Sequence, residues 1–197
     1  MRPNRRNEIV AAAIREASRH GVSGSTVRAI AAEAGVTEGA IYRHFSSKEE
    51  LCQAAYCQIV AEMAAQKQAI VRSPGPIPHK FRSWILVTYE YFDRFPEAFA
   101  YVLLKDHDFP PQIRDVAGRQ GRMLAGMIEE AVAAGEIDEI DPTLAVSHFT
   151  GLMLNLPRLI GESSIPGPAV DYLDDVVEAV YRVFGIRCGG EEMHAGE

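Results

Sequence analysis

The stretch Thr26–Leu51 constrains the fold of this chain most, because it combines the spacing of a turn between two short helices with a new helix start. A helix-turn-helix needs a small residue where its two helices cross and a residue in the turn that can adopt a positive φ. Ala31 and Gly35 supply these features in that order. Six residues after the glycine, Ile41 is placed to pack back onto the first helix. The stretch therefore predicts a helix-turn-helix.

Helices are also predicted on both sides of this unit. Apolar residues recur at three- and four-residue spacing over Glu8–His20, and Gly21 follows as a residue typical of a helix end. Ser47 and Glu50 have the spacing of a capping box, which predicts a long helix running to about Val71. That helix would join the N-terminal domain to the rest of the chain.

The charge of the chain is divided unevenly. A net charge of −7 argues at first against a nucleic-acid partner, because contacts to phosphate dominate affinity for DNA. Residues 1–48, however, contain eight basic and four acidic side chains, a balance of +4, whereas the remaining residues contain 12 and 23, a balance of −11. A basic N-terminal part joined to an acidic body is typical of a small DNA-binding domain with a separate second domain.

Several polar residues of the predicted helix-turn-helix are candidates for DNA contact. Ser25 or Thr26 can cap the second helix, and Arg28 lies near its positive end, where it would meet a phosphate or remain a solvated surface arginine. Thr37 is a candidate cap of the third helix. Lys48, in the first turn of the next helix, would point toward the same phosphates.

The third helix would present its N-terminal residues to the major groove. Arg43 suits guanine or phosphate, and Tyr42 and His44 carry donors that suit phosphate oxygens. Glu38 suits either a cytosine amino group or the positive end of its own helix. The arginines in Met1–Asn7 would contact phosphate or the minor groove, or form an ordinary solvated terminus.

These motifs resemble the tetracycline-repressor (TetR) family of bacterial regulators over about residues 8–55. The resemblance is carried by Thr26-Val27-Arg28-Ala29-Ile30-Ala31, Ala34-Gly35-Val36 and Gly39-Ala40-Ile41-Tyr42-Arg43-His44-Phe45, followed by Lys48 and Leu51. It implies a homodimer with an N-terminal three-helix DNA-binding domain and a variable helical C-terminal domain. Members of this family usually repress transcription and leave the operator when a small ligand enters the C-terminal core.

The resemblance also implies roles for individual residues. Positions that hold double-stranded operator DNA in the family, mostly through phosphates, are matched by Thr26, Arg28, Thr37, Gly39, Tyr42, His44 and Lys48. Ala40 and Arg43 match more variable positions that face the bases. Glu38 departs from the lysine or serine that often stands at its position, so a phosphate contact is not carried over to it.

The rest of the chain is also predicted to be helical, with no convincing alternating strand, which makes the protein all-α. Three prolines in Ser73–Pro78 end the long helix. Further helices are expected over about His79–Arg94 and about Gln112–Ala134, two others are expected to begin at Pro96 and Pro142, and the last is expected to end at Phe184. Pro157 is expected to kink or shorten its helix. The expected domains are residues 1–50 for DNA binding and 51–186 for ligand binding and dimerisation, with a loose tail over 187–197.

Aromatic and methionine side chains gather on these helices and line either a ligand pocket or the core. The candidate pocket residues are Trp84, Tyr89, Phe92, Phe99, Leu103, Met123, Met127, His148 and Phe149. His148, on an apolar helix face, also fits a core histidine. Asp106, His107 and Asp108 are adjacent on a loop and would need further ligands to hold a metal, so neither a metal nor a cofactor is expected.

The last two helices are apolar enough to pair with a second copy as a four-helix bundle or to complete the monomer core. The chain shows no signal peptide and no run long enough to cross a membrane, and three cysteines fit a reducing compartment, so we expect a cytoplasmic protein. Cys52, Cys57 and Cys188 fit packing or surface positions, with redox sensing as the alternative.

The sequence therefore favours a DNA-binding transcriptional regulator. A repressor that a small-molecule effector releases from its operator is the leading interpretation, and an activator or an architectural protein remains open. The alternative is a helical small-molecule-binding protein or enzyme whose basic N-terminal part is incidental. We find no nucleophile elbow, phosphate-binding loop or metal-spaced His and Glu pair in the sequence, so an enzyme is not expected.

Overall fold

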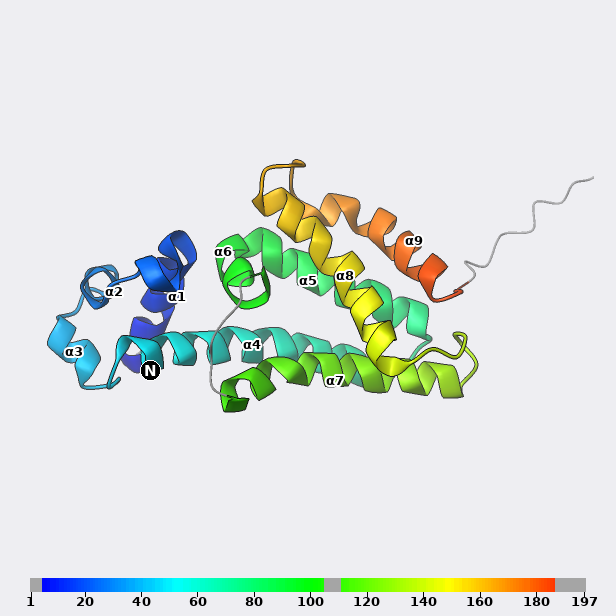
Figure 1. The fold of residues 1–197 in the computed structure, drawn as a ribbon, viewed down its shortest axis with the longest axis horizontal. Coiled ribbons are helices and arrows are strands. Elements are labelled where there is room, and N and C mark those ends of the chain that lie inside the picture. Colours follow the sequence, from blue (N-terminus) through cyan, green and yellow to red (C-terminus); the bar gives the residue numbers. More distant parts are fainter. Residues whose placement is uncertain (1–4, 105–110, 187–197) are drawn as a thin grey trace, which may run out of the picture. The chain divides into compact units, whose positions relative to one another are not determined.

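The computed structural model describes residues 5–104 and 111–186, and these residues are helical with connecting turns (Figure 1). The predicted all-α fold is confirmed. The chain divides into two compact units: unit 1 contains residues 1–66 and 91–120, and unit 2 contains residues 67–90 and 121–197. The predicted loose tail lies outside the described residues, and the boundary at residue 50 remains a prediction.

The helices begin and end close to the predicted positions. Their bounds are α1 Arg5–Gly24, α2 Val27–Ala34, α3 Glu38–Tyr42, α4 Lys48–Arg72, α5 Ile77–Arg94, α6 Pro96–Phe99, α7 Pro111–Ala133, α8 Pro142–Gly161 and α9 Leu173–Val183. A π-helical turn, Ala100–Leu104, follows α6, and a 3₁₀ turn, Ala169–Tyr172, precedes α9.

The helix-turn-helix forms as the sequence predicts. Gly35 ends α2 with φ 64°, a left-handed conformation that the missing Cβ permits, and its backbone N–H reaches the last carbonyls of the helix. Ile41 and Phe45 are buried, and both join a core cluster with residues of α1, α2 and the first turns of α4. The members on α4 are Leu51 and Ala55, so the long helix starts inside the core of the DNA-binding domain.

The predicted end of α1 at Gly21 is a break inside the helix. Gly21 has φ 70° and ψ 165°, which is not helical, and a further turn follows to Gly24. The Ser25 hydroxyl donates to the Gly21 carbonyl oxygen at 2.7 Å, and the Ser25 backbone N–H donates to the same oxygen at 3.0 Å. These bonds satisfy the carbonyl that the break leaves open.

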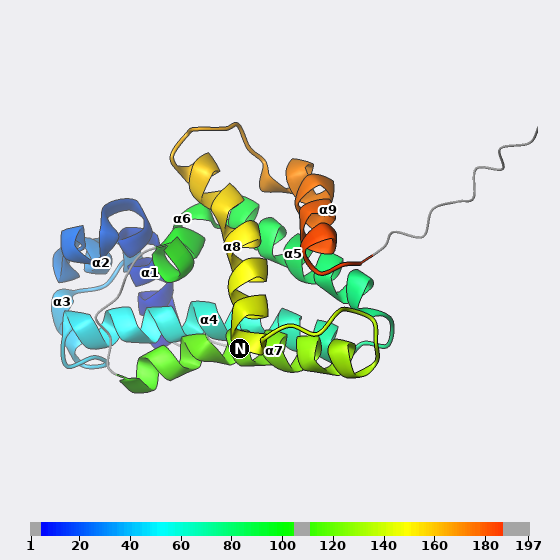
Figure 2. The same ribbon diagram turned by 45° about the vertical axis from the view of Figure 1, so that its right-hand side comes forward.

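Unit 2 has an aromatic core. Phe81 of α5 lies 4.8 Å, centroid to centroid, from Phe149 of α8 and 5.1 Å from Phe184 at the end of α9. All three side chains are buried. Figure 2 shows α8 and α9 with the strongly turned connection between them. These large side chains hold together helices that are far apart in the sequence.

Helix α8 continues through Pro157 to Gly161, although this proline was expected to kink or shorten it. Pro157 has no N–H to donate to the Met153 carbonyl four residues earlier. The hydroxyl of Tyr89 on α5 donates to that carbonyl instead, at 3.2 Å. A hydrogen bond from another helix thus replaces the one that the proline removes.

A membrane-spanning helix would have to be long and continuously apolar, and none of the described helices meets both conditions. Among residues 5–104 and 111–186, no group of three or more His, Cys, Asp and Glu side chains is arranged to hold a metal ion. Asp106, His107 and Asp108 lie outside these ranges, so the structure does not address their suggested role.

Candidate nucleic-acid interface

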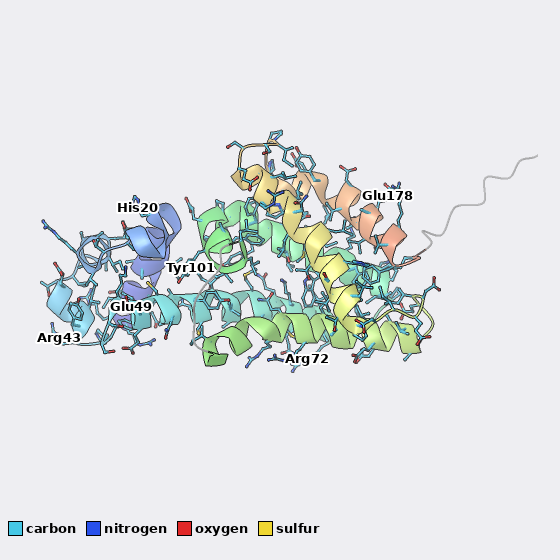
Figure 3. All side chains as sticks on the ribbon, in the orientation of Figure 1. His20, Arg43, Glu49, Arg72, Tyr101 and Glu178 are labelled. Atoms are coloured by element: carbon cyan, nitrogen blue, oxygen red, sulfur yellow. The ribbon has the colours of Figure 1, made fainter. Side chains whose placement is uncertain are left out.

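Helix α3 has one buried and one exposed side. Ile41 is 1% exposed and anchors the helix in the core, whereas Tyr42 next to it is 54% exposed. Arg43 and His44 are exposed as well, and Figure 3 shows Arg43 at the α3 end of the structure. The buried anchor therefore fixes a short helix whose polar side chains remain free to meet another molecule.

Two threonines at helix starts cap their helices and can also bind a phosphate. Thr26 Oγ1 accepts from the Ala29 backbone N–H at 3.1 Å, and Thr37 Oγ1 accepts from the Ala40 N–H at 3.2 Å. A hydroxyl that accepts through a lone pair still carries its own hydrogen. Both side chains are exposed, so each can donate that hydrogen to a phosphate oxygen.

An ion-pair cluster joins α1 to α2. Glu33 of α2 accepts from Arg15 Nε at 2.5 Å and from Arg19 at 3.3 Å, both on α1. The hydrogen bond from Arg15, together with the charges of both arginines, holds the pKa of Glu33 below its usual range. The cluster thus ties the bracing helix to the first helix of the helix-turn-helix.

Lys48 has a structural contact in addition to its predicted role. Its Nζ donates to the Ser25 carbonyl oxygen at 3.2 Å, and the side chain is partly buried. The start of α4 is capped beside it: the Glu50 N–H donates to Ser47 Oγ at 3.1 Å, while the Glu50 carboxylate accepts from the N–H and hydroxyl of Ser46. The predicted capping box is therefore present with its second half shifted by one residue.

Arg5 is a candidate that the predicted set of site residues did not include. Together with residues of the turn and α3 it lines a cavity of about 480 Å³ on the exposed side of the helix-turn-helix. The other lining residues are Gly35, Val36, Thr37, Ala40, Arg43 and His44. The signal in the sequence was the run of arginines without acidic residues over residues 1–7.

Arg6 has a different environment from Arg5. Its guanidinium lies 4.8 Å from the centroid of the Phe45 ring, which belongs to the core cluster. A cation–π contact of this kind attaches the start of α1 to the core. Arg2 lies outside the described residues.

The nine candidate DNA-binding residues lie on α2, α3, the adjoining turns and the first turn of α4. Thr26, Arg28, Thr37, Gly39, Tyr42, Arg43 and His44 are exposed, and Ala40 and Lys48 are partly buried. Glu38 is exposed at the first position of α3, where both interpretations of its carboxylate remain open.

The candidate ligand residues are divided between the two units. Phe92, Phe99 and Leu103 belong to unit 1, whereas Trp84, Tyr89, Met123, Met127, His148 and Phe149 belong to unit 2. Six of the nine are at most 3% exposed, namely Trp84, Tyr89, Phe92, Phe99, Met127 and Phe149. The interpretation of His148 as a core histidine is wrong, because its side chain is exposed.

Cys52 and Cys57 on α4 are free thiols. Burial raises the pKa of both, which lowers the fraction of reactive thiolate. The Tyr101 hydroxyl, on the π-helical turn, donates to the Cys52 carbonyl at 3.2 Å. These contacts favour a packing role for Cys52, and Cys188 lies outside the described residues.

The exposed face of α3 belongs to a helix-turn-helix, and a larger helical part follows it in the chain. Residues 9–55 match the model of the family described as bacterial regulatory proteins, tetR family. The chain is 43% identical over 71 residues to the HTH-type transcriptional repressor AcnR of Corynebacterium diphtheriae. That match covers 36% of this chain and 35% of AcnR, so it spans about a third of the relative's length.

Solved structures resemble the chain over almost its full length. The regulator FadR of Bacillus subtilis in complex with stearoyl-CoA superimposes with a TM-score of 0.79 at 20% identity, over 92% of this chain and 99% of that protein. A tetR-family regulatory protein of Rhodococcus RHA1 gives 0.80 at 21% identity, over 94% and 99%. At these identities the likeness shows a shared fold. The family model matches residues 9–55, so the similarity to tetR-family regulators in sequence is carried by the helix-turn-helix region.

Proposed function

We propose that the protein is a sequence-specific repressor that binds operator DNA as a homodimer and leaves it when a small molecule binds. The observation that carries the first part is the amphipathic α3. Ile41 fixes the helix in the core, while Tyr42 at the end of the helix and Arg43 and His44 directly after it are exposed. A helix held in this way can enter a major groove with its side chains toward bases and phosphates.

The proposed contacts divide into two kinds. Arg43 and Ala40 face the bases, while Thr26, Arg28, Thr37, Gly39, Tyr42, His44 and Lys48 hold the sugar-phosphate backbone. Arg5 is added to the second kind, because it lines the same cavity as Thr37 and Arg43. A site of this kind acts on chromosomal DNA in the cytoplasm.

The proposed dimer interface is formed by α8 and α9. Leu144 on α8 is 49% exposed and Val183 on α9 is 46% exposed, which leaves apolar surface on both helices. Two copies related by a twofold axis would form a four-helix bundle from these helices. A dimer would also supply two copies of α3 for half-sites one helical turn apart.

The proposed effector binds in the helical C-terminal part, among the nine candidate ligand residues. Binding would stabilise an arrangement of the two DNA-binding domains that no longer fits successive grooves, and operator DNA must then weaken ligand binding by the same factor. Stearoyl-CoA, which is bound in the Bacillus subtilis FadR structure, is a suitable first probe. A titration of DNA-saturated protein that shows an unchanged affinity for an established ligand would contradict this coupling.

The first test is selection of genomic fragments bound by the full-length chain, followed by titration of the selected site. We expect Arg43→Ala to change base preference at one position by roughly 1–3 kcal/mol, and Arg28→Ala to weaken all sequences alike and reduce the salt dependence. Fluorescence anisotropy over a series of salt concentrations measures both effects.

Lys48→Ala needs a stability control, because Lys48 also bonds to the Ser25 carbonyl. Its affinity should therefore be compared at temperatures well below its own unfolding transition. Equal effects of Arg43→Ala and Arg28→Ala on every sequence would refute the division into base and phosphate contacts. A wild-type chain that binds no genomic fragment at low salt would favour the alternative of a small-molecule-binding protein or enzyme.

A further inference from the structure

A second cavity, separate from the DNA-binding face, lies within unit 1. It has a volume of about 400 Å³ and is lined by residues of α1, α4, α5 and α6 and of the α5–α6 junction. This volume is within the range of small-molecule sites, roughly 300–1,000 Å³. The walls carry charged groups of both signs and two aromatic rings. The charge of a suitable ligand therefore depends on which of these groups already have a partner within the protein.

The positive charges of the cavity are compensated by the protein itself. Arg15 and Arg19 line it from α1, and both guanidinium groups bond to Glu33. Their affinity for a further anion is reduced because a carboxylate already occupies donors of both.

The negative charges are not compensated in the same way. Glu62 lines the cavity from α4, and its carboxylate accepts a hydrogen bond from the neutral amide of Gln58 at 3.1 Å. Within residues 5–104 and 111–186, no Lys, Arg or His forms an ion pair with it at 4 Å or less. Glu97, at the start of α6, adds a second carboxylate to the wall. The wall therefore carries two guanidinium groups that already bond to Glu33 and two carboxylates, of which Glu62 has no ion-pair partner among the described residues.

Aromatic rings form the neighbouring wall. Tyr91 and Phe95 are 5.3 Å apart, centroid to centroid, and inclined at 54°. Burial, with a smaller contribution from the charge of Glu62, raises the pKa of Tyr91 to about 12, so the phenol remains neutral at physiological pH. The Arg94 guanidinium lies 5.1 Å from the Phe95 centroid, so a ligand cation would rely mainly on the Tyr91 ring.

We infer that this cavity binds an organic cation with a flat apolar body, with Glu62 as its counter-ion and Tyr91 and Phe95 as the aromatic surface. The carboxylate attracts the positive centre, the rings add cation–π attraction, and Ala11, Ile14 and Ala98 contact the apolar body. An anion of the same size would meet Glu62 and Glu97. This site goes beyond the proposed function, whose effector binds among other residues.

The test uses the full-length chain without DNA and two fluorescent probes of opposite charge. Thioflavin T is a flat monocation, and 1-anilinonaphthalene-8-sulfonate is an aromatic anion. We expect saturable binding of thioflavin T and at least tenfold weaker binding of the sulfonate. Equal affinity for both probes, or no binding of thioflavin T, would overturn the proposal.

Three variants separate the site from non-specific dye binding. Glu62→Gln keeps the shape and removes the charge, and should weaken thioflavin T binding about tenfold. Glu90→Gln, at an exposed carboxylate next to Tyr91 that does not line the cavity, should leave it unchanged. Tyr91→Leu removes the ring and should weaken binding roughly threefold or more, whereas Tyr91→Phe should keep it within about twofold.

An unchanged dye affinity in Glu62→Gln would refute the assignment. Circular dichroism checks that each variant is folded, and calorimetric titration gives the stoichiometry, expected to be one cation per chain. Because no DNA is present, these results do not depend on whether the chain represses transcription. Loss of operator binding with intact dye binding would count against the proposed function alone.

Discussion

The threonine caps of the helix-turn-helix and the tyrosine hydrogen bonds of unit 2 join groups that are separated by very different distances along the chain. In the helix-turn-helix, Thr26 and Thr37 each cap the N–H of the residue three positions later. In unit 2, the Tyr89 hydroxyl bonds to a carbonyl 64 residues away, and the Tyr181 hydroxyl bonds to the Pro78 carbonyl 103 residues away. Local bonds form as soon as the helix forms, whereas distant bonds require the whole unit to be packed.

This difference implies that changes to buried polar groups should be costly in unit 2 and moderate in the helix-turn-helix. Removing the partner of a buried polar group costs more free energy of unfolding than removing an exposed helix cap, because water can replace the cap but cannot reach the buried group. Three predictions examine this contrast, beginning with the largest expected effect.

Lys67 is the buried polar group of unit 2 for which we expect the largest effect on stability. It is 3% exposed, its Nζ lies 4.9 Å from the Trp84 ring centroid, and burial lowers its pKa to about 7. The unfolded chain keeps this proton up to about pH 10.4, so it binds more protons than the folded chain between these values. Stability should therefore rise as the pH is raised from about 7 to about 10, by a few kcal/mol.

The measurement is the free energy of unfolding in urea at several pH values, compared with Lys67→Met. The difference in unfolding free energy between the wild type and Lys67→Met should change with pH, shifting in favour of the wild type as the pH rises and the folded lysine becomes neutral. Lys80→Met, at a partly exposed lysine of the same unit, is the matched control and should show no such trend. A constant difference between Lys67→Met and the wild type at every pH would contradict the buried-charge explanation.

The Tyr89 hydroxyl provides a more specific test, because its partner is defined. Tyr89→Phe leaves the Met153 carbonyl, which Pro157 cannot serve, without its donor. We expect a loss of about 1–3 kcal/mol in the free energy of unfolding. In a chain that also carries Pro157→Ala, position 157 can donate to that carbonyl, so the same Tyr89→Phe change should cost much less.

A double-mutant cycle over Tyr89 and Pro157 isolates this coupling. Additive effects of the two substitutions would show that the tyrosine does not replace the missing backbone bond. In that case, distant polar contacts would not distinguish unit 2 from the helix-turn-helix.

The same contrast explains what could be predicted from the sequence. Gly35, the threonine caps and the buried Ile41 were predictable because each acts within a few positions of its own place in the chain. The continuation of α8 through Pro157 was not, because it depends on a tyrosine far away in the sequence.

The candidate binding residues follow the same rule. Tyr42 and Arg43 were predicted to contact DNA because of the donors that they carry, and both side chains are exposed. The side chains predicted to line a ligand pocket could be recognised as apolar, but their periodicity did not show which would be fully buried, as Trp84 is, and which exposed, as His148 is. The position of Arg5 in the cavity beside α3 depends on how α1 packs against the turn, which the sequence alone did not show.

The smallest effects are expected in the helix-turn-helix, where two glycines give a matched pair. No heavy atom lies within 4 Å of a Cβ built on Gly35 or Gly39, so an alanine side chain meets no steric clash within the protein at either position. The two substitutions therefore differ in stability only through the backbone conformation. Gly35 has φ 64°, so Gly35→Ala should cost about 1–2 kcal/mol of unfolding free energy. Gly39 lies within α3, so Gly39→Ala should gain up to about 1 kcal/mol.

Gly39→Ala should stabilise the fold but weaken DNA binding, whereas Gly35→Ala should destabilise the fold and change DNA binding less. Gly39 is exposed on the proposed DNA-binding face, so a methyl group there would hold the helix away from the groove and weaken operator binding despite the gain in stability. Gly35→Ala, measured well below its unfolding transition, should bind DNA with less change. Thermal denaturation and anisotropy titration of both variants test this, and a Gly39→Ala chain that is more stable and binds DNA normally would remove Gly39 from the interface.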